Sequence, residues 1–194
     1  MAAGIKYDLA PMEGSMPEMC RFDTVFRYSG GYNLVTDHLT GAFPPLAPVV
    51  LDYVKRTATP VINVKVHKDI TASNTSLEVE KNSFAYVGMH LGNGTNGGTI
   101  KAIDKSKPTH DVITLEATPT LVAKKGDVLF EAKDNTGKQP KATANALNYS
   151  WKKIEPGASI TAIGQAFEIR PSKLIVPISE KDKASLGDRF MFTH

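Results

Sequence analysis

The chain has 194 residues, of which 41% are hydrophobic and 22% charged, and its formal net charge is +3. These values are typical of a soluble protein with one domain and an appendage, or with two small domains. So weak a charge does not demand a nucleic-acid partner, and we do not expect one. Cys20 is the only cysteine, which excludes an intrachain disulfide.

The first 60 residues hold six of the twelve prolines and show little clean alternation of apolar and polar residues. We expect an extended tail over residues 1–20 and one strand over residues 21–28. Pro44, Pro45 and Pro48 disfavour a helix interior and a central strand. Residues 1–60 are therefore interpreted as an extended, proline-rich arm.

Apolar side chains are dense along this arm, and two explanations stay open with equal weight. They fold back onto the protein's own core, or they stay uncovered and pack on a partner, since such dense exposed patches are unusual on monomers. Under the second explanation, the residues that contact the partner are Phe22, Phe26, Phe43, Leu46, Val49, Val50 and Tyr53.

Residues 61–194 carry better strand signals. Ile62, Val64 and Val66 alternate with polar residues, which is the period of a half-buried strand. Ser179 is a suitable N-cap and Gly187 a suitable stop for one short helix over residues 179–186. Further strands are expected at 77–80, 84–89, 99–103, 112–116, 128–131, 144–151, 160–163, 166–169, 174–176 and 190–192.

The pattern predicts a mainly β protein: a β-sandwich or barrel domain of short strands, with an extended N-terminal arm and one short C-terminal helix. The polar loop at residues 133–143 is a candidate separation between two lobes of the 61–194 domain.

The segment from Gly92 to Gly97 matches the glycine spacing of a dinucleotide-binding turn. That fingerprint requires a helix to begin there, because the helix N-terminus receives the pyrophosphate. A strand-like stretch over residues 99–103 follows instead, so we favour a Gly/Asn hairpin turn.

No other motif indicates chemistry. The five histidines, at positions 38, 67, 90, 110 and 194, lack the short spacing of metal ligands and are interpreted as scattered residues. There is no nucleophile elbow, and no pair of carboxylates stands out for acid–base work. We therefore assign no catalytic, cofactor-binding or metal-binding residue and expect neither a cofactor nor an enzyme.

Residues 63–192 resemble the head-fibre or capsid decoration proteins of tailed bacteriophages. The resemblance rests on residues 77–89, 124–132, 144–179 and 181–192, and it covers about two-thirds of the chain. It implies a β-rich domain mounted on an icosahedral capsid, often as a trimer, and sometimes the base of a longer fibre. The implied partners are the major capsid protein, further copies of the chain and other head-fibre proteins. The family supplies no catalytic residues.

The leading hypothesis is therefore a non-enzymatic virion protein at the capsid surface, assembled in the host cytoplasm. It would stabilise the shell or anchor fibres, with residues 1–60 as the capsid or inter-subunit contact. The start of the chain lacks a signal peptide and no apolar run reaches the ~20 residues of a membrane span, so no membrane partner is expected. The alternative is a carbohydrate- or host-surface-binding β module, with Tyr32, Tyr86, Tyr149 and Trp151 as its contact aromatics. Trp151 is favoured as a core residue.

Overall fold

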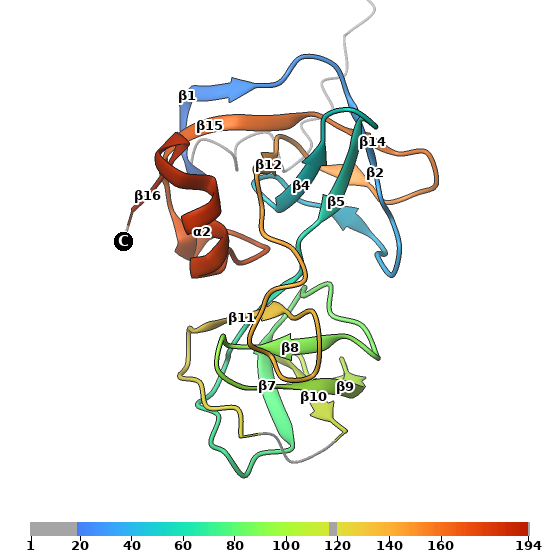
Figure 1. Cartoon of the computed structure of the whole chain (residues 1–194), viewed down its shortest axis with the longest axis vertical. Coiled ribbons are helices and arrows are strands. Elements are labelled where there is room, and N and C mark those ends of the chain that lie inside the picture. The colour runs from blue at the N-terminus through green and yellow to red at the C-terminus, as the bar shows by residue number, and fades with distance from the viewer. Residues whose placement is uncertain (1–18, 117–119, 194) are drawn as a thin grey trace, which may run out of the picture.

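The computed structural model describes residues 19–116 and 120–193, and it is mainly β, as the sequence predicts (Figure 1). Two lobes lie one above the other. The chain builds part of the first lobe, runs through the whole of the second and returns. We call residues 19–61 and 144–193 the discontinuous lobe, and residues 62–143 the inserted lobe.

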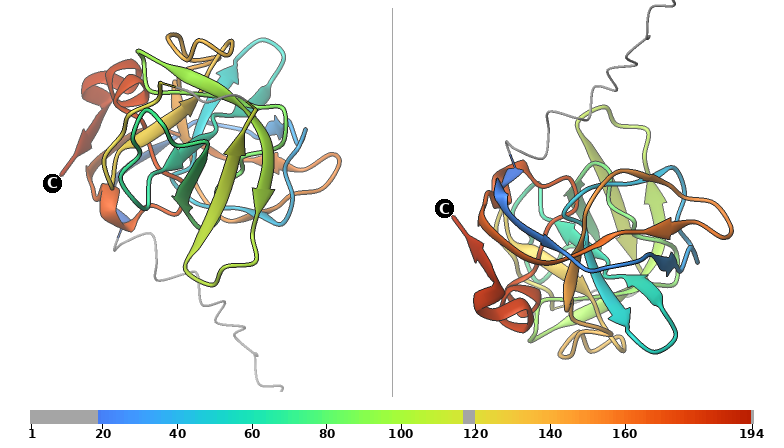
Figure 2. Two further views of the ribbon diagram at one scale, coloured as in Figure 1. Left: turned by 90° about the horizontal axis from the view of Figure 1, so that it is seen from below. Right: turned by 90° about the horizontal axis from the view of Figure 1, so that it is seen from above.

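The discontinuous lobe is built on an eight-stranded sheet with the order β1-β15-β12-β4-β5-β2-β14, to which β16 adds in parallel alongside β15. Viewed from above, β1 and β15 run side by side across the top of the molecule (Figure 2). The bounds are β1 Arg21–Arg27, β2 Tyr32–Leu34, β4 Pro48–Asp52, β5 Thr57–Pro60, β12 Ala146–Asn148, β14 Ser159–Ile160, β15 Ala162–Ile169 and β16 Phe190–Phe192. A short pair, β3 Ala42–Phe43 and β13 Lys152–Lys153, lies outside this sheet.

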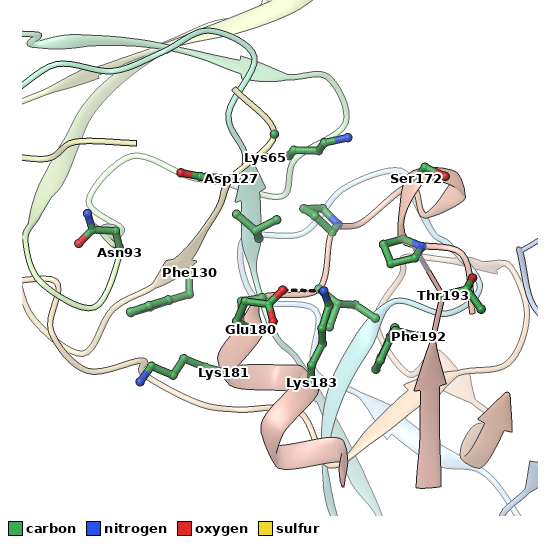
Figure 3. Close-up of a pocket in the computed structure, with 16 residues that line it drawn as sticks. Lys65, Asn93, Asp127, Phe130, Ser172, Glu180, Lys181, Lys183, Phe192 and Thr193 are labelled. Carbon is green, nitrogen blue, oxygen red and sulfur yellow. Dashed lines mark hydrogen bonds and ion pairs between the residues drawn. The ribbon is translucent and has the colours of Figure 1, made fainter. Parts of the chain in front are cut away.

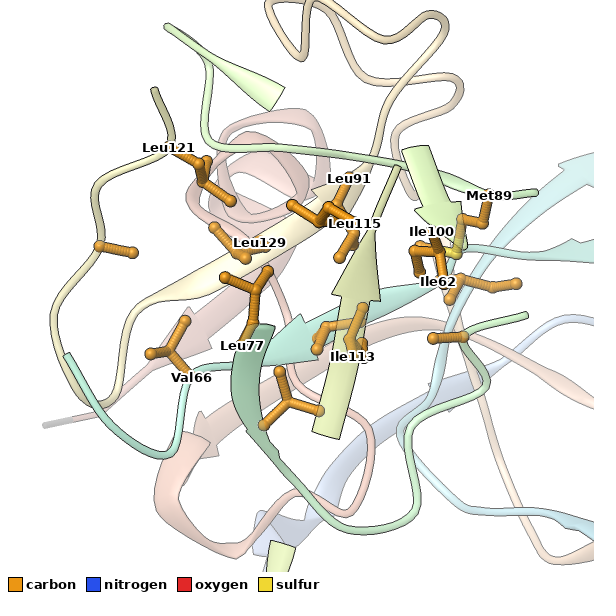
Figure 4. Close-up of a cluster of buried hydrophobic side chains, with 14 of the residues drawn as sticks. Ile62, Val66, Leu77, Met89, Leu91, Ile100, Ile113, Leu115, Leu121 and Leu129 are labelled. Atoms are coloured by element: carbon orange, nitrogen blue, oxygen red, sulfur yellow. The ribbon is translucent and has the colours of Figure 1, made fainter. Parts of the chain in front are cut away.

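The inserted lobe has a six-stranded sheet with the order β6-β11-β8-β9-β10-β7. A bridge between Val66 and Val79 joins the two outer strands, so the sheet closes on itself as a small barrel. Its interior is filled by aliphatic side chains such as Leu77, Leu91 and Ile113 (Figure 4). The bounds are β6 Asn63–Lys65, β7 Ser76–Glu80, β8 His90–Gly92, β9 Gly97–Asp104, β10 His110–Leu115 and β11 Val128–Glu131.

The glycine-rich segment is a hairpin, as favoured above: β8 ends at Gly92, β9 begins at Gly97, and these two residues pair. Gly92 and Gly97 are glycines because the backbone at Gly137 approaches both of them closely. A Cβ on Gly92 would lie 2.3 Å from the carbonyl oxygen of Gly137, and one on Gly97 would lie 2.5 Å from its Cα. The loop after β11 therefore packs directly against this hairpin, and no side chain fits between them.

The proline-rich segment is integrated into the discontinuous lobe. Pro48 is the first residue of β4, where its missing N–H is tolerated. Asn148 is fully buried, and its backbone carbonyl oxygen accepts a hydrogen bond from Leu46 N at 2.8 Å. Its Nδ2 donates to the carbonyl oxygen of Pro44 at 2.7 Å. These bonds satisfy backbone groups that the prolines leave without ladder partners, so the segment is held inside the fold.

The two lobes are joined at helix α2, Glu180–Leu186, with Ser179 as its N-cap and Gly187 directly after its end, as the sequence predicts. Asp182 in this helix is buried, and its carboxylate accepts hydrogen bonds from both lobes. Asn63 Nδ2, at the start of β6, donates to Asp182 Oδ2 at 2.7 Å, and Ala144 N donates to Oδ1 at 2.9 Å. The Ser179 hydroxyl donates to Oδ2 at 2.6 Å. One carboxylate thus links both chain crossings between the lobes to the helix.

Candidate contact surface

The most exposed apolar side chains of the discontinuous lobe lie on β1 and on the turn between β4 and β5. Phe22 is 49% exposed and Phe26 64%, while Tyr53 is 50% and Val54 93% exposed. We call these four residues the β1 surface. Large side chains this accessible are candidates for contact with another molecule.

Strand β1 is the edge of its sheet, and its geometry presents side chains rather than a regular backbone ladder. Its register against β15 shifts between Arg21 and Phe26. Within this bulge the Thr24 hydroxyl accepts a hydrogen bond from Phe167 N at 2.9 Å, in place of a backbone carbonyl. Bulges protect sheet edges from uncontrolled strand addition, and they re-aim the side chains they carry.

Aromatic and arginine side chains support both ends of β1. The Phe22 and Tyr149 ring centroids are 6.4 Å apart, and Arg27, the last residue of β1, places its guanidinium 4.7 Å from the Tyr149 centroid, so Tyr149 contacts side chains from both ends of the strand. Such aromatic and cation–π contacts hold exposed rings in defined positions.

Directly after β1, the Tyr28 and Tyr53 rings meet edge to face at 5.7 Å. Arg189 Nη1 donates to the Tyr28 hydroxyl at 3.2 Å. Burial, followed by the hydrogen bond to Tyr28, raises the pKa of Tyr53 to about 12. Tyr53 is therefore neutral at physiological pH and presents half of its ring to solvent as an uncharged surface.

The seven residues predicted to contact a partner differ in how exposed their side chains are in the structure. Phe22, Phe26 and Tyr53 are exposed, and Val50 is partly buried against the core. Phe43, Leu46 and Val49 are 1%, 0% and 0% exposed, so for these three side chains the explanation that they fold back onto the protein's own core holds. All three fill the cores of the discontinuous lobe. Val49 is covered because β4 is an inner strand between β12 and β5, while Phe43 on β3 and Leu46 precede that strand. Partner contact itself stays a prediction.

The division of the chain at residue 60 also stays a prediction as a functional boundary. The first 18 residues of the chain lie outside the described residues. Residues 21–60 contribute strands β1 to β5, and all but β3 pair within the eight-stranded sheet. The chain enters the inserted lobe just after residue 60, and the loop at 133–143 lies on the return path.

The aromatics proposed for glycan contact lie in different surroundings. Tyr32 is buried in the core at 2% exposure, and Tyr149 packs beside Phe22. Tyr86 stacks on His38 with ring centroids 4.1 Å apart and donates a hydrogen bond to Glu131 Oε1 at 2.6 Å. Trp151 is partly buried, and its indole nitrogen has no hydrogen-bond partner within the described residues. These contacts are those of packed side chains.

A cleft of about 630 Å³ separates the two lobes beside α2 (Figure 3). Lys65, Asp127 and Phe130 approach it from the inserted lobe, while Glu180 and Lys183 approach it from the discontinuous lobe. Lys183 Nζ and Glu180 Oε1 pair at 2.6 Å. The charges in this cleft are mixed, so it has no clear preference for an anionic or a cationic ligand.

Two of the five histidines are not scattered. His67 and His110 stack with ring centroids 5.1 Å apart, and Glu78 lies beside them. Sequence spacing could not reveal this group because its members come from three separate segments that meet only when the barrel closes. The available signal was alternation: Glu78 lies on the opposite face of β7 from the core residues Leu77 and Val79.

Within the described residues, no helix is long and apolar enough to cross a membrane. No curated protein and no solved structure matches the chain significantly. A family described as head fiber protein matches residues 7–192, nearly the whole length. That span includes both lobes and the β1 surface, and it extends the resemblance seen in residues 63–192. The chain therefore belongs to the phage head fiber protein family, whose members are virion structural proteins.

Proposed function

We propose that this protein is a non-enzymatic subunit that binds the outer surface of a phage capsid, as a decoration or head-fibre protein, through the β1 surface. The observation that carries the proposal is the pair of exposed rings of Phe22 and Phe26 on a bulged sheet edge, together with exposed Tyr53 and Val54 on the turn between β4 and β5. Family membership supplies the setting, a virion. The partner is the major capsid protein, and further copies of the chain lie at neighbouring sites.

The size of the effect follows from the exposed area. Burying a whole phenylalanine side chain stabilises a complex by about 1.5–3 kcal/mol. Phe22 and Phe26 are already partly buried in the protein alone, so burying the remainder of each ring on binding contributes roughly half of that free energy. Together the two rings contribute about 2 kcal/mol, which corresponds to roughly 30-fold in affinity at one site. A capsid repeats the site many times, so an oligomeric subunit would gain further through multivalency.

The bulge in β1 favours contact through side chains over addition of a strand from the partner. Arg21 and Asp23 on the same edge pair with each other at 3.0 Å and are both well exposed. Charged side chains on an edge discourage uncontrolled pairing with other strands. The proposed interface is therefore an apolar centre of aromatic rings with a charged rim, the usual anatomy of a specific protein interface.

The test uses the full chain and capsids that lack it. The double variant Phe22→Ser, Phe26→Ser removes both rings from an exposed edge, and Val87→Ser is the matched control, since Val87 is 61% exposed in the inserted lobe. We expect the double variant to co-sediment with capsids roughly 30-fold more weakly per site, and the control to bind like the unaltered protein.

Two outcomes would contradict different parts of the proposal. Equal binding by the double variant and the unaltered protein would exclude the β1 surface as the contact. Failure of the unaltered protein to bind capsids, with retention on host cell-wall glycans instead, would replace capsid attachment with the carbohydrate-binding alternative.

A further inference from the structure

A compact group of metal-ligand side chains lies on the outer face of the inserted lobe, whereas the β1 surface belongs to the discontinuous lobe. In β7, Leu77 and Val79 point into the barrel, so Glu78 and Glu80 point outward. On one side of β7 lies β10, in which His110 stands directly opposite Glu80 in the antiparallel backbone pairing. On the other side, His67 N donates to the carbonyl oxygen of Glu78 at 2.9 Å. Three adjacent backbone segments thus converge on one spot.

The donor atoms of His67, Glu78 and His110 all lie within 4.8 Å of one another. His110 Nε2 and Glu78 Oε2 are 3.8 Å apart, which is too long for a direct hydrogen bond. Zinc binds histidine nitrogen and carboxylate oxygen at about 2.0–2.2 Å, so two tetrahedral ligand atoms lie about 3.4 Å apart. The 3.8 Å pair must close by about 0.4 Å and no pair by more than about 1.4 Å, which rotation of these partly exposed side chains supplies.

Each imidazole has an acceptor beside its Nδ1 atom. His67 Nδ1 lies 3.3 Å from Glu80 Oε1, and His110 Nδ1 lies 3.0 Å from Thr109 Oγ1. A ring that donates from Nδ1 to such an acceptor keeps the Nε2 lone pair available for a metal. Metal-bound histidines in proteins are oriented by this kind of contact, most often to a carboxylate or a carbonyl.

We propose that His67, Glu78 and His110 bind one divalent transition-metal ion, with zinc as the preferred metal and Glu80 as a positioning residue for His67. Two imidazoles and one carboxylate are a donor set that zinc accepts, with water completing four-coordination. The three side chains are between 20% and 34% exposed, so the ion has a route in and is partly shielded. Lys68 Nζ, 3.4 Å from Glu78 Oε1 and 69% exposed, is easily displaced.

A metal here would cross-link the seam of the barrel. Val66 and Val79 make the bridge that closes the sheet, and His67 follows directly after that bridge. The ion would tie this segment to β7 and to β10 on its far side. Since an ion that binds only the folded state stabilises it by mass action, zinc should raise the stability of the inserted lobe.

The test uses the full chain, stripped of metal by a chelator and titrated with zinc chloride against a chromophoric chelator. We expect one tight equivalent. His67→Gln and His110→Gln should each lose at least 100-fold in affinity, and Glu80→Gln about 10–100-fold. His90→Gln is the matched control, because the His90 ring contacts Thr99 outside this group, and it should bind like the unaltered protein.

A second readout is the thermal unfolding midpoint, which zinc should raise in the unaltered protein and in His90→Gln but not in His110→Gln. Should a histidine variant fail to fold, Glu78→Gln preserves the side-chain shape and gives the same comparison. X-ray absorption of the zinc-loaded protein should show two imidazoles and no sulfur. Absence of a saturable equivalent, a sulfur ligand, or unchanged affinity in both histidine variants would overturn the proposal.

Discussion

Asp182 is the residue whose loss should most damage the connection between the lobes. It is 1% exposed, and its carboxylate accepts hydrogen bonds from Asn63 Nδ2, Ala144 N, Ser179 N and Ser179 Oγ. Asp182→Ala removes the acceptor and leaves these donors in a buried site. Unlike an exposed residue, a buried donor without its acceptor cannot recover a hydrogen bond from water.

The magnitude can be worked bond by bond. An orphaned buried donor costs about 1–3 kcal/mol, and Ala144 N has no other acceptor among its hydrogen bonds in the described residues. Asn63 Nδ2 keeps the carbonyl of Pro177 at 3.0 Å, so its loss is partial. Loss of the two hydrogen bonds that Ser179 N and Ser179 Oγ donate to the carboxylate costs about 1 kcal/mol more. The sum is about 3–5 kcal/mol, a large share of the 5–15 kcal/mol typical of folded proteins.

The assay is equilibrium urea unfolding of the full chain, followed by far-ultraviolet circular dichroism and by the fluorescence of Trp151, the only tryptophan. Asp188→Ala is the matched control, because Asp188 is an exposed acid just beyond the same helix and should change stability by less than about 0.5 kcal/mol. A loss of under about 1 kcal/mol in Asp182→Ala would refute the role of this carboxylate as the link between lobes.

Two further predictions concern single residues. Gly97→Ala should destabilise the protein by at least about 2 kcal/mol, because its Cβ would meet the backbone of Gly137, whereas Gly31→Ala, with only ordinary contacts, should be nearly neutral in the same urea titration. Burial raises the pKa of the Cys20 thiol to about 11, so native protein at pH 8 should react with a thiol reagent far more slowly than protein in urea. The pKa of the Cys20 thiol in the folded protein lies above its value near 9 in the unfolded chain. The stabilisation from the protonated thiol is therefore complete below pH 9 and is lost as the pH rises towards 11. Unfolding titrations at pH 8 and 10.5 would detect this loss. Equal labelling rates in the native and unfolded states would contradict the burial of Cys20.

Several local sequence signals match the structure, whereas the strands expected over residues 84–89 and 174–176 are wrong, because neither stretch forms a strand. Ser179 and Gly187 mark the ends of α2, and alternation at Leu77 and Val79 identifies β7 and its buried face. The Gly/Asn segment is a hairpin because β9 follows it without a helix. Each of these features depends on neighbours a few residues away, so the chain itself carries the information.

Long-range pairing accounts for what the sequence did not reveal. Prolines 44, 45 and 48 indicate an extended segment, but only the partner strand decides whether it is covered, and Asn148 lies about a hundred residues downstream. The same holds for the histidine group: His67 and His110 have no short spacing and meet only across β7. Phe22 and Phe26 are exposed because β1 is an edge strand, a position that the sequence alone does not specify.

The path of the chain leads to a final prediction about which part folds by itself. Fifteen of the sixteen buried residues in the barrel core lie between Ile62 and Leu129, and Leu39 is the exception. The discontinuous lobe, in contrast, takes core residues from both ends of the chain, such as Leu46 and Val49 beside Leu147 and Ile163. A fragment of residues 62–142 should therefore unfold cooperatively and give dispersed amide resonances.

Deleting residues 1–55 should have the opposite effect on the discontinuous lobe. It removes β1 to β4, leaving β12 and β15 without their neighbours β4 and β1 and exposing the apolar face around Ile163. Unpaired strands beside an open core bind hydrophobic dyes and aggregate. In a nitrogen–proton correlation spectrum of the deletion variant, resonances from the inserted lobe should persist while those from residues 144–193 collapse. Retention of native dispersion by residues 144–193 would mean that the leading segment is a separable appendage, and capsid binding through the β1 surface could then be tested by its simple removal.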